Sequence, residues 1–287
     1  MSGLKDYINK KMQYFWHVQV RCLPFNYQIR PGRRNSSDIK IVGMIRERNE
    51  SLLLKDTLDH LARFVDALIV FDDASDDDSV SIALKHPSVA EVIINKQWKK
   101  SGRVWEETAN RKKLHQRAKK LRPEWFFYAD ADERFEGNIR EYLLEDCPDS
   151  ISGIKISLFD SYITKNDAQP YMATQKLFNF RKYFGPERRD ILMIWRNGRG
   201  ADFLIPDARE PQNVSPKETE TRFYCQHYGK SLSIQHWEDT CKYYADHFPK
   251  YSEKWRARMG KAVHDKSDFG APLMGWDDVK AHGVAMK

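Results

Sequence analysis

Two aspartates two positions apart, Asp130 and Asp132, come directly after a run of aromatic and small residues that is typical of a buried strand. Side chains two positions apart in a strand point to one face, so the two carboxylates converge if the pleat continues. Because an unpaired carboxylate is costly to bury, acids at the end of a buried strand need cations. Two convergent carboxylates suit a hard divalent cation that keeps open positions for phosphate oxygens. The alternative interpretation is a strand that ends in a solvated acidic turn.

Polar clusters also lie at the ends of two predicted strands earlier in the chain. The alternation of strands and helices predicts a parallel, doubly wound sheet, whose ligands lie beyond the carboxyl ends of the strands. Clusters at residues 46–50, 72–78 and 130–133 fall at those ends, so we expect one composite site. The predicted strands cover residues 39–45, 67–71, 89–94 and 126–129, and the predicted helices cover residues 50–64, 79–85 and 104–121.

The second half of the chain has a less regular pattern. Residues 181–215 are loop-rich and mixed in charge. Residues 233–259 predict a long helix rich in aromatic residues, which Pro249 breaks or kinks. The predicted strands of this half cover residues 153–159, 174–180 and 220–227.

Residues 1–37 differ in composition from the rest of the chain, because they mix aromatic residues with lysine and arginine. Three interpretations are open: an interfacial amphipathic segment that touches anionic lipid, an arm packed on the domain, or a dimer contact. The residues concerned are Lys5, Tyr7, Lys10, Lys11, Tyr14, Phe15, Trp16, Arg21, Phe25, Tyr27, Arg30, Arg33 and Arg34.

Composition sets broad limits on function. The 287 residues include 48 Lys and Arg against 41 Asp and Glu, and this net charge of +7 suits an anionic ligand, an acidic membrane surface or nucleic acid. The sequence lacks a transmembrane-length apolar run and a signal-peptide core. We therefore expect a cytoplasmic protein, with peripheral contact at the inner face of the membrane as an option. Four cysteines without CxxC spacing predict reduced thiols and no zinc site: Cys22, Cys147, Cys225 and Cys241.

Three segments together resemble the GT-A glycosyltransferases of family two. They are an Arg-Glu-Arg-Asn-Glu turn within residues 41–51, an Asp-Asp-Ala-Ser-Asp segment within residues 64–79, and Tyr-Ala-Asp-Ala-Asp-Glu at residues 128–133. His-Tyr-Gly-Lys at residues 227–230 is a weaker match. The resemblance implies an α/β GT-A, Rossmann-like fold with a mostly parallel central sheet flanked by helices.

The resemblance also implies an activity and a domain organisation. The enzyme would move a sugar from a nucleotide-diphosphate donor, expected to be a UDP-sugar, to a hydroxyl of a glycan, polysaccharide or lipid-linked acceptor, with inversion. Residues 1–37 would form an arm, residues 38–232 the transferase domain, and residues 233–287 a helical extension. Within the domain, residues 38–136 would bind the nucleotide-sugar and residues 137–232 the acceptor.

For the metal, the resemblance implies that Asp132 binds Mn²⁺ or Mg²⁺ and that Asp130 contacts the metal or the ribose. A divalent cation would stabilise the charge that grows on the diphosphate leaving group. His227 is a candidate to complete the metal shell, and His236 competes with it for that role. Glu133 is expected to support the motif or bind acceptor.

Six further residues are implied to contact the donor. One of the two aspartates after the second strand would contact the base or ribose, although both also suit the cap of the next helix. Two arginines and a glutamate after the first strand would line the nucleotide pocket, with Asn49 as a helix cap beside a solvated Arg48 as the alternative. An arginine on the helix before the metal motif would meet the diphosphate, unless that basic helix is only a solvated face. The donor-site candidates are Arg46, Arg48, Glu50, Asp72, Asp73 and Arg111.

An inverting enzyme needs a carboxylate that takes the proton of the acceptor hydroxyl. The candidates for this general base are Asp190, Asp207 and Glu210. Residues 205–211 loosely resemble the family's Val-His-Glu loop, but Arg209 stands where the family has histidine.

Other classes of function fit the sequence less well. A sugar nucleotidyltransferase would have a glycine-rich loop after the first strand, and an Asp-x-Asp-x-Thr phosphatase would not continue with Glu133-Arg134. A nucleic-acid binder is not expected, because the basic stretches contain no helix-turn-helix, RNP or zinc pattern. The remaining alternative is a degenerate GT-A fold that binds a nucleotide or glycan without catalysis. The sequence does not indicate an oligomeric state.

Overall fold

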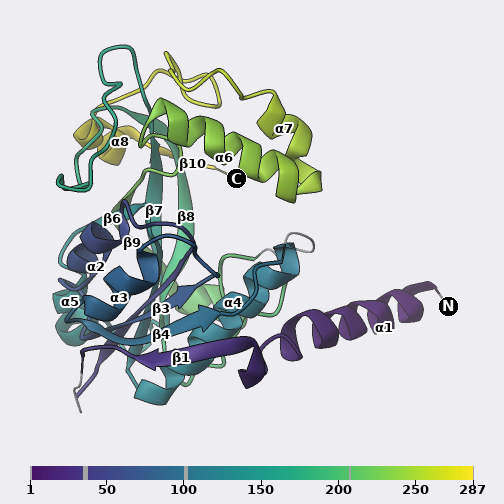
Figure 1. The fold of residues 1–287 in the computed structure, drawn as a ribbon. Coiled ribbons are helices and arrows are strands. Elements are labelled where there is room, and N and C mark those ends of the chain that lie inside the picture. Colours follow the sequence, from purple (N-terminus) through teal and green to yellow (C-terminus); the bar gives the residue numbers. More distant parts are fainter. Residues whose placement is uncertain (1, 35–37, 100–102, 207, 287) are drawn as a thin grey trace.

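In the computed structural model, residues 2–34, 38–99, 103–206 and 208–286 are described, with the side chains of residues 2–6 and 10 left out. They form a ten-stranded sheet with helices on both faces (Figure 1). The strand order is β1-β4-β3-β2-β5-β8-β7-β9-β6, and β10 pairs with β8. The strands are β1 (Tyr27–Pro31), β2 (Ile41–Glu47), β3 (Ala67–Asp72), β4 (Val89–Asn95), β5 (Trp125–Asp130), β6 (Glu133–Glu136), β7 (Gly153–Ser161), β8 (Phe184–Arg196), β9 (Thr219–His227) and β10 (Val284–Ala285).

The helices alternate with the strands of the first half, so the predicted α/β class with a parallel sheet centre and flanking helices is confirmed. The helices are α1 (Ser2–Tyr14), α2 (Leu54–Leu61), α3 (Ser79–Lys85), α4 (Arg103–Ala118), α5 (Ile139–Glu141), α6 (Ile234–His247), α7 (Ser252–Arg256) and α8 (Trp276–His282). None of the described helices is both long and apolar enough to span a membrane.

The parallel centre of the sheet positions the predicted site. β4, β3, β2 and β5 run parallel in that order, and the register places Arg46 opposite Asp130 and Glu47 opposite Asp72. The carboxyl ends of β2, β3 and β5 therefore meet at one edge of the sheet, as the sequence predicts. β1, which lies within residues 1–37, pairs antiparallel with β4.

The second half differs from the sequence prediction in two places. The predicted strand at residues 174–180 is wrong, because these residues form turns in which Leu177 packs against Leu53 and Tyr228. The predicted loop at residues 181–215 contains the 13-residue β8. A half-buried polar middle, residues 187–190, interrupts two buried runs of β8 and hides the strand pattern.

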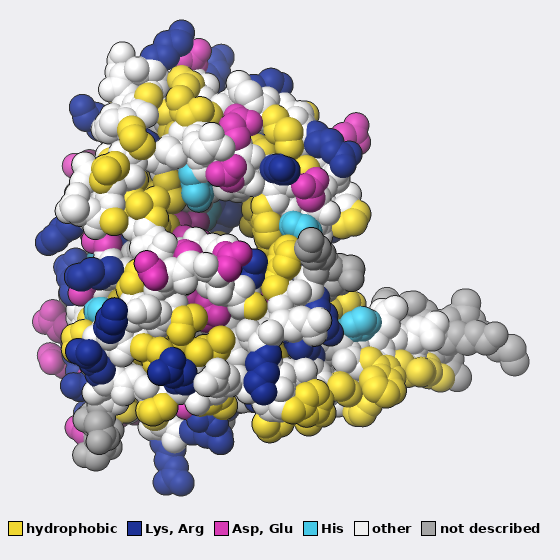
Figure 2. Space-filling model, in the orientation of Figure 1, with side chains coloured by type: hydrophobic (Ala, Val, Ile, Leu, Met, Phe, Trp, Pro, Cys, Tyr) yellow, Lys and Arg dark blue, Asp and Glu magenta, His cyan; other side chains and the backbone are white. Residues whose placement is uncertain are grey.

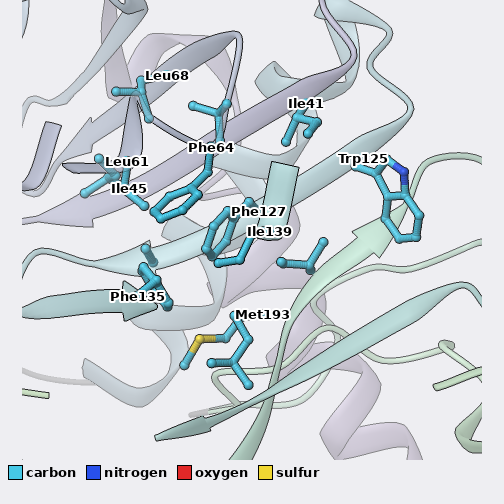
Figure 3. Close-up of a cluster of buried hydrophobic side chains, with 14 of the residues drawn as sticks. Ile41, Ile45, Leu61, Phe64, Leu68, Trp125, Phe127, Phe135, Ile139 and Met193 are labelled. Atoms are coloured by element: carbon cyan, nitrogen blue, oxygen red, sulfur yellow. The ribbon is translucent and has the colours of Figure 1, made fainter. Parts of the chain in front are cut away.

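Apolar clusters lie on both faces of the sheet. On one face, α2 and α5 cover the cluster drawn in Figure 3, in which the ring of Phe127 lies beside the rings of Phe64 and Phe135. On the other face, α4 packs Leu114 and Ala118 against the remaining side chains of β2 and β5. β2 and β5 thus each contribute side chains to both helical layers. This packing fixes the position of their carboxyl ends.

The C-terminal segment returns over the site end of the sheet. The predicted helix at residues 233–259 is divided into α6 and α7 at Pro249, as expected for proline. Ser233 caps α6, since its hydroxyl accepts a hydrogen bond of 3.0 Å from the amide of His236. Figure 2 shows the surface hollowed below α6, with acidic and histidine side chains at its rim.

Candidate active site

The two aspartates of the predicted metal motif have different partners. Asp130 accepts a hydrogen bond of 3.2 Å from the Tyr128 hydroxyl and lies 3.6 Å from the Arg209 guanidinium. Asp132 lies 3.3 Å from Nε2 of His227. Burial would raise the pKa of Asp132, but His227 outweighs it and lowers this pKa to about 2. Asp132 is therefore a carboxylate at neutral pH.

Glu50 joins these aspartates across the strand ends. Its amide donates to the hydroxyl of Ser79, and the charges of both aspartates act on its carboxyl group. Burial, with Asp132 and Asp130 next in importance, raises the pKa of Glu50 to about 8. Glu50 therefore keeps its proton at neutral pH, beside Asp130 and Asp132.

His227 bridges two carboxylates. Its Nδ1 lies 2.6 Å from Asp160 and its Nε2 faces Asp132. Burial would lower the pKa of His227, but the two aspartates raise it to about 9, so the ring is an imidazolium at neutral pH. Gly229 keeps this space open, because a Cβ there would lie 2.5 Å from Oδ2 of Asp132.

Three arginines form the positive side of the site. Arg46 lies 2.6 Å from Oε2 of Glu107, and Arg111 donates to the same oxygen at 3.2 Å. Arg209 binds Glu133, whose other oxygen accepts from the amide of Asp130 at 2.9 Å. The interpretation of α4 as a solvated face is wrong for Arg111, which is buried and also donates to Tyr128.

The two aspartates at the end of β3, Asp72 and Asp73, are both buried and already bonded. Asp73 accepts from Asn95 at 2.7 Å and binds Arg103. Asp72 accepts from the amide of Ser75, and burial raises its pKa. Neither caps α3, because Asp77 accepts from the first amide of that helix.

The turn after β2 is held by the loop that connects β3 to α3. Arg48 donates to the carbonyls of Asp73 and Ala74, and its guanidinium lies 4.4 Å from the centre of the Trp98 ring. Arg48 is therefore not simply solvated. Asn49 adopts a positive φ of 55° and accepts from the amide of Asp76, so its side chain stabilises this loop and does not cap α2.

The three candidates for the general base are placed differently. Asp190 accepts from Ser157, and because neighbouring strand residues point to opposite faces, it faces away from Arg189, which contacts Asp160 and His227. Asp207 lies outside the described residues. Glu210 comes directly after Arg209, which brings the backbone of Glu210 beside the acidic motif.

Sequence reasoning missed Arg209, Glu107 and the face of α6 that covers the site. The spacing Arg103-Glu107-Arg111 on α4 was a usable signal, because i,i+4 pairs lie on one helix face. Several residues of this region have a buried polar side-chain atom without a hydrogen-bond partner. Within the described chain these atoms include Nε of Arg46 and Arg209, Nε1 of Trp98 and Nδ1 of His236.

The side chains of this site could hold a divalent cation only if further ligands completed its coordination shell. In the described chain, no three His, Cys, Asp or Glu side chains are arranged as a ready metal centre. Asp130 and Asp132 offer oxygen ligands, and burial together with their charges raises the pKa of the neighbouring Glu50. The residues fit a hard cation whose other ligands would come from phosphate and water.

Two surface pockets lie apart from the candidate site and are not lined by its residues. Two pockets of about 440 and 620 Å³ lie beside Arg63 and Gly137, beyond the far end of β6. The candidate site is defined by convergent charges under α6 and not by these pockets.

No family model matches the chain. It is 34% identical over 182 residues to uncharacterized proteins of Mycobacterium tuberculosis and Mycobacterium bovis, a match that covers 62% of this chain and 42% of each relative. The chain thus spans less than half the length of these curated relatives.

Solved structures give distant likenesses. A mannosyltransferase from Pyrobaculum calidifontis in complex with GDP-Man and Mn²⁺ is 15% identical, with a TM-score of 0.36 over 90% of this chain and 74% of that one. Glucosyl-3-phosphoglycerate synthase from Mycobacterium tuberculosis, in complex with Mn²⁺, UDP and glucosyl-3-phosphoglycerate, is 18% identical, with a TM-score of 0.28 over 43% and 45%. Function therefore has to be inferred from the site.

Proposed function

We propose that this protein is a metal-dependent glycosyltransferase that uses a nucleotide-diphosphate sugar, with a UDP-sugar as the expected donor. One observation carries the proposal: Asp130, Asp132 and Glu50 converge at the carboxyl ends of parallel strands, and Arg46, Arg111 and Arg209 surround them. A site that combines excess carboxylates with arginines suits a ligand that brings phosphate and a cation together.

The donor would lie between the strand ends and α6. The arginines Arg46, Arg111 and Arg209 would bind the diphosphate, because a guanidinium donates two parallel hydrogen bonds to phosphate oxygens. Asp72, rather than the fully paired Asp73, would be the carboxylate for the base or ribose. Glu50 and the Arg48 turn would close the pocket around the nucleotide.

Asp130 and Asp132 would hold the Mn²⁺ or Mg²⁺ ion, with His227 at the edge of its shell. When bound, the ion would stabilise negative charge on the leaving diphosphate. The imidazolium of His227 lies between Asp132 and Asp160 with one protonated nitrogen facing each carboxylate, so it would orient Asp132.

Glu210 is the proposed general base. It would take the proton of the acceptor hydroxyl while that oxygen forms a bond to the anomeric carbon. The bond from this carbon to the diphosphate oxygen breaks in the same displacement, which inverts the configuration and releases the nucleoside diphosphate. The acceptor would be a hydroxyl of a glycan, polysaccharide or lipid-linked sugar.

The test is calorimetric titration of UDP, with GDP for comparison, in Mn²⁺ and in EDTA. We expect nucleotide binding that needs metal and that weakens about 100-fold or more in Asp132→Asn, because one of two cation ligands loses its charge. Asp149→Asn is the matched control, since its side chain is fully exposed and remote from the site. Failure of the wild-type protein to bind either nucleotide in any metal would refute the proposal.

A second arm separates a transferase from a binding module. A screen of nucleotide-sugars for metal-dependent hydrolysis or transfer should give turnover that Glu210→Gln lowers at least tenfold, while nucleotide affinity stays unchanged. Metal-dependent binding without turnover on any donor would identify a degenerate fold that binds the nucleotide only.

A further inference from the structure

The N-terminal helix exposes apolar side chains that no other part of the described chain covers. Ile8 and Met12 lie one turn apart on α1, and Phe15 and Trp16 begin the π-helical segment that directly follows it (Phe15–Gln19). The exposed fractions of these four side chains run from 47% to 61%. Figure 2 shows hydrophobic side chains along one edge of this projecting helix. Nearly half of the large hydrophobic side chains exposed in the described chain belong to its first 29 residues.

This apolar face continues past the helix. Leu23 and Phe25, in the segment that leads to β1, are also exposed, Phe25 by 66%. We call the exposed apolar side chains of residues 7–25 the arm face. A contiguous exposed apolar surface of this kind marks an interaction site in a soluble protein.

The helix is anchored at one end and projects beyond it. The ring of Tyr14 packs edge-on against Trp105, His17 stacks on the same ring, and Val18 is buried against α4. Towards its N-terminus, α1 extends away from the body (Figure 1). An isolated helix of 13 residues is marginal in water, so a surface that covers the arm face would also stabilise the helix.

The charges next to the arm face select its partner. Between Tyr7 and Arg34 the sequence has no Asp or Glu. Arg21 is buried against Glu106, at 2.8 Å. The remaining bases in this stretch, of which the last four have exposed side chains, are Lys10, Lys11, Arg30, Arg33 and Arg34.

We propose that the arm face docks on an anionic membrane surface. Aromatic and methionine side chains would enter the boundary between headgroups and acyl chains, and the flanking bases would face the anionic headgroups. A second copy of this chain is a poorer occupant, because it would bring two acid-free basic segments together. The docking is independent of the proposed transferase activity.

The experiment is flotation of the full chain with vesicles of phosphatidylcholine alone or with about 30 mol % phosphatidylglycerol. We expect binding to the anionic vesicles only, weakened by added salt. The double variant Phe15→Ser/Trp16→Ser should reduce this binding at least tenfold. Lys11→Glu should reduce it less, and Phe269→Ser, an exposed aromatic outside the arm, should not change it.

Sedimentation equilibrium of the same proteins tests the competing possibility, that a second copy of this chain covers the arm face. The proposal is supported by a monomer that binds anionic vesicles through Phe15 and Trp16. It is overturned by absence of vesicle binding, by binding that the double variant leaves unchanged, or by self-association that the double variant abolishes.

Discussion

Asp73 and Asp132 come after strands on either side of β2 at the same edge of the sheet, yet their surroundings differ. Asp73 is fully buried and bonded to Asn95 and Arg103, with Arg46 at 3.7 Å. Burial would raise its pKa, but Arg103 lowers it. Two arginines face the Asp73 carboxylate, so the fold itself accounts for its charge.

Asp132 lies in a cluster that the fold leaves unbalanced. Its own partner is His227, but Asp130 and Asp132 lie near Glu50, and their charges add to burial in raising the pKa of Glu50 to about 8. The cost of gathering like charges persists in the ligand-free protein. The comparison teaches how to interpret an acidic residue at the end of a strand. It has a structural role when its charge is paired, and it is a candidate ligand-binding residue when other acidic residues gather beside it.

The largest effect on folding is expected from Asp73→Asn. The substitution leaves Arg103 buried without its carboxylate, and breaking one partner of a buried ion pair typically costs about 3–5 kcal/mol. Urea unfolding followed by fluorescence measures the loss, with Asp149→Asn as the exposed control. A loss below about 1 kcal/mol, the usual value for a surface pair, would mean that Asp73 is not structural and would break the comparison.

A smaller, pH-dependent effect is expected from His227→Gln. The folded-state pKa of His227 is raised to about 9, so its stabilising contribution is complete below the unfolded value and is lost as pH rises through 9. The variant should be less stable than the wild type by about 1–3 kcal/mol near pH 6, with the gap closing by about pH 10. Thermal unfolding across this range measures the gap, and His282→Gln, in an exposed position, is the control. A gap that is constant with pH would show that the imidazolium is not paired with Asp132 and Asp160.

The sequence predicts the strand-end carboxylates because their convergence results from a local rule. Parallel strands bring their carboxyl ends to one edge, so residues 46–50, 72–78 and 130–133 must meet once the alternation is recognised. The positions of Arg209 and of α6 depend on how the second half of the chain returns over the sheet. No periodicity in the sequence encodes that path.

The sequence also does not predict which charged residues are buried. α4 contains five Lys and Arg residues from Arg103 to Arg117, and such a composition is typical of a solvated helix. Its charged side chains instead pair with one another along the helix, as in Arg103–Glu107, and with other elements, as in Lys112–Asp202. Pairing offsets the cost of burial, and the partner on a distant loop is invisible to a local pattern.

The smallest and most diagnostic effect is expected from Glu50→Gln, which removes one like charge from the unbalanced cluster. Glu50 ionises near its ordinary pKa when unfolded but at about 8 when folded, so it costs stability increasingly from about pH 4.5 to 8. The variant should therefore be more stable than the wild type through this range. The full change in pKa would correspond to roughly 5 kcal/mol at the upper end; because Glu50 is partly exposed and glutamine does not replace all its contacts, we expect about 1–2 kcal/mol. Thermal unfolding in EDTA measures this gain in stability, with Glu253→Gln as the exposed control.

Saturating Mn²⁺ should reduce the gain in stability, because a cation neutralises the same carboxylates. A gain that Mn²⁺ leaves unchanged would place the cation elsewhere, whereas no gain at any pH would show that Glu50 does not face Asp130 and Asp132.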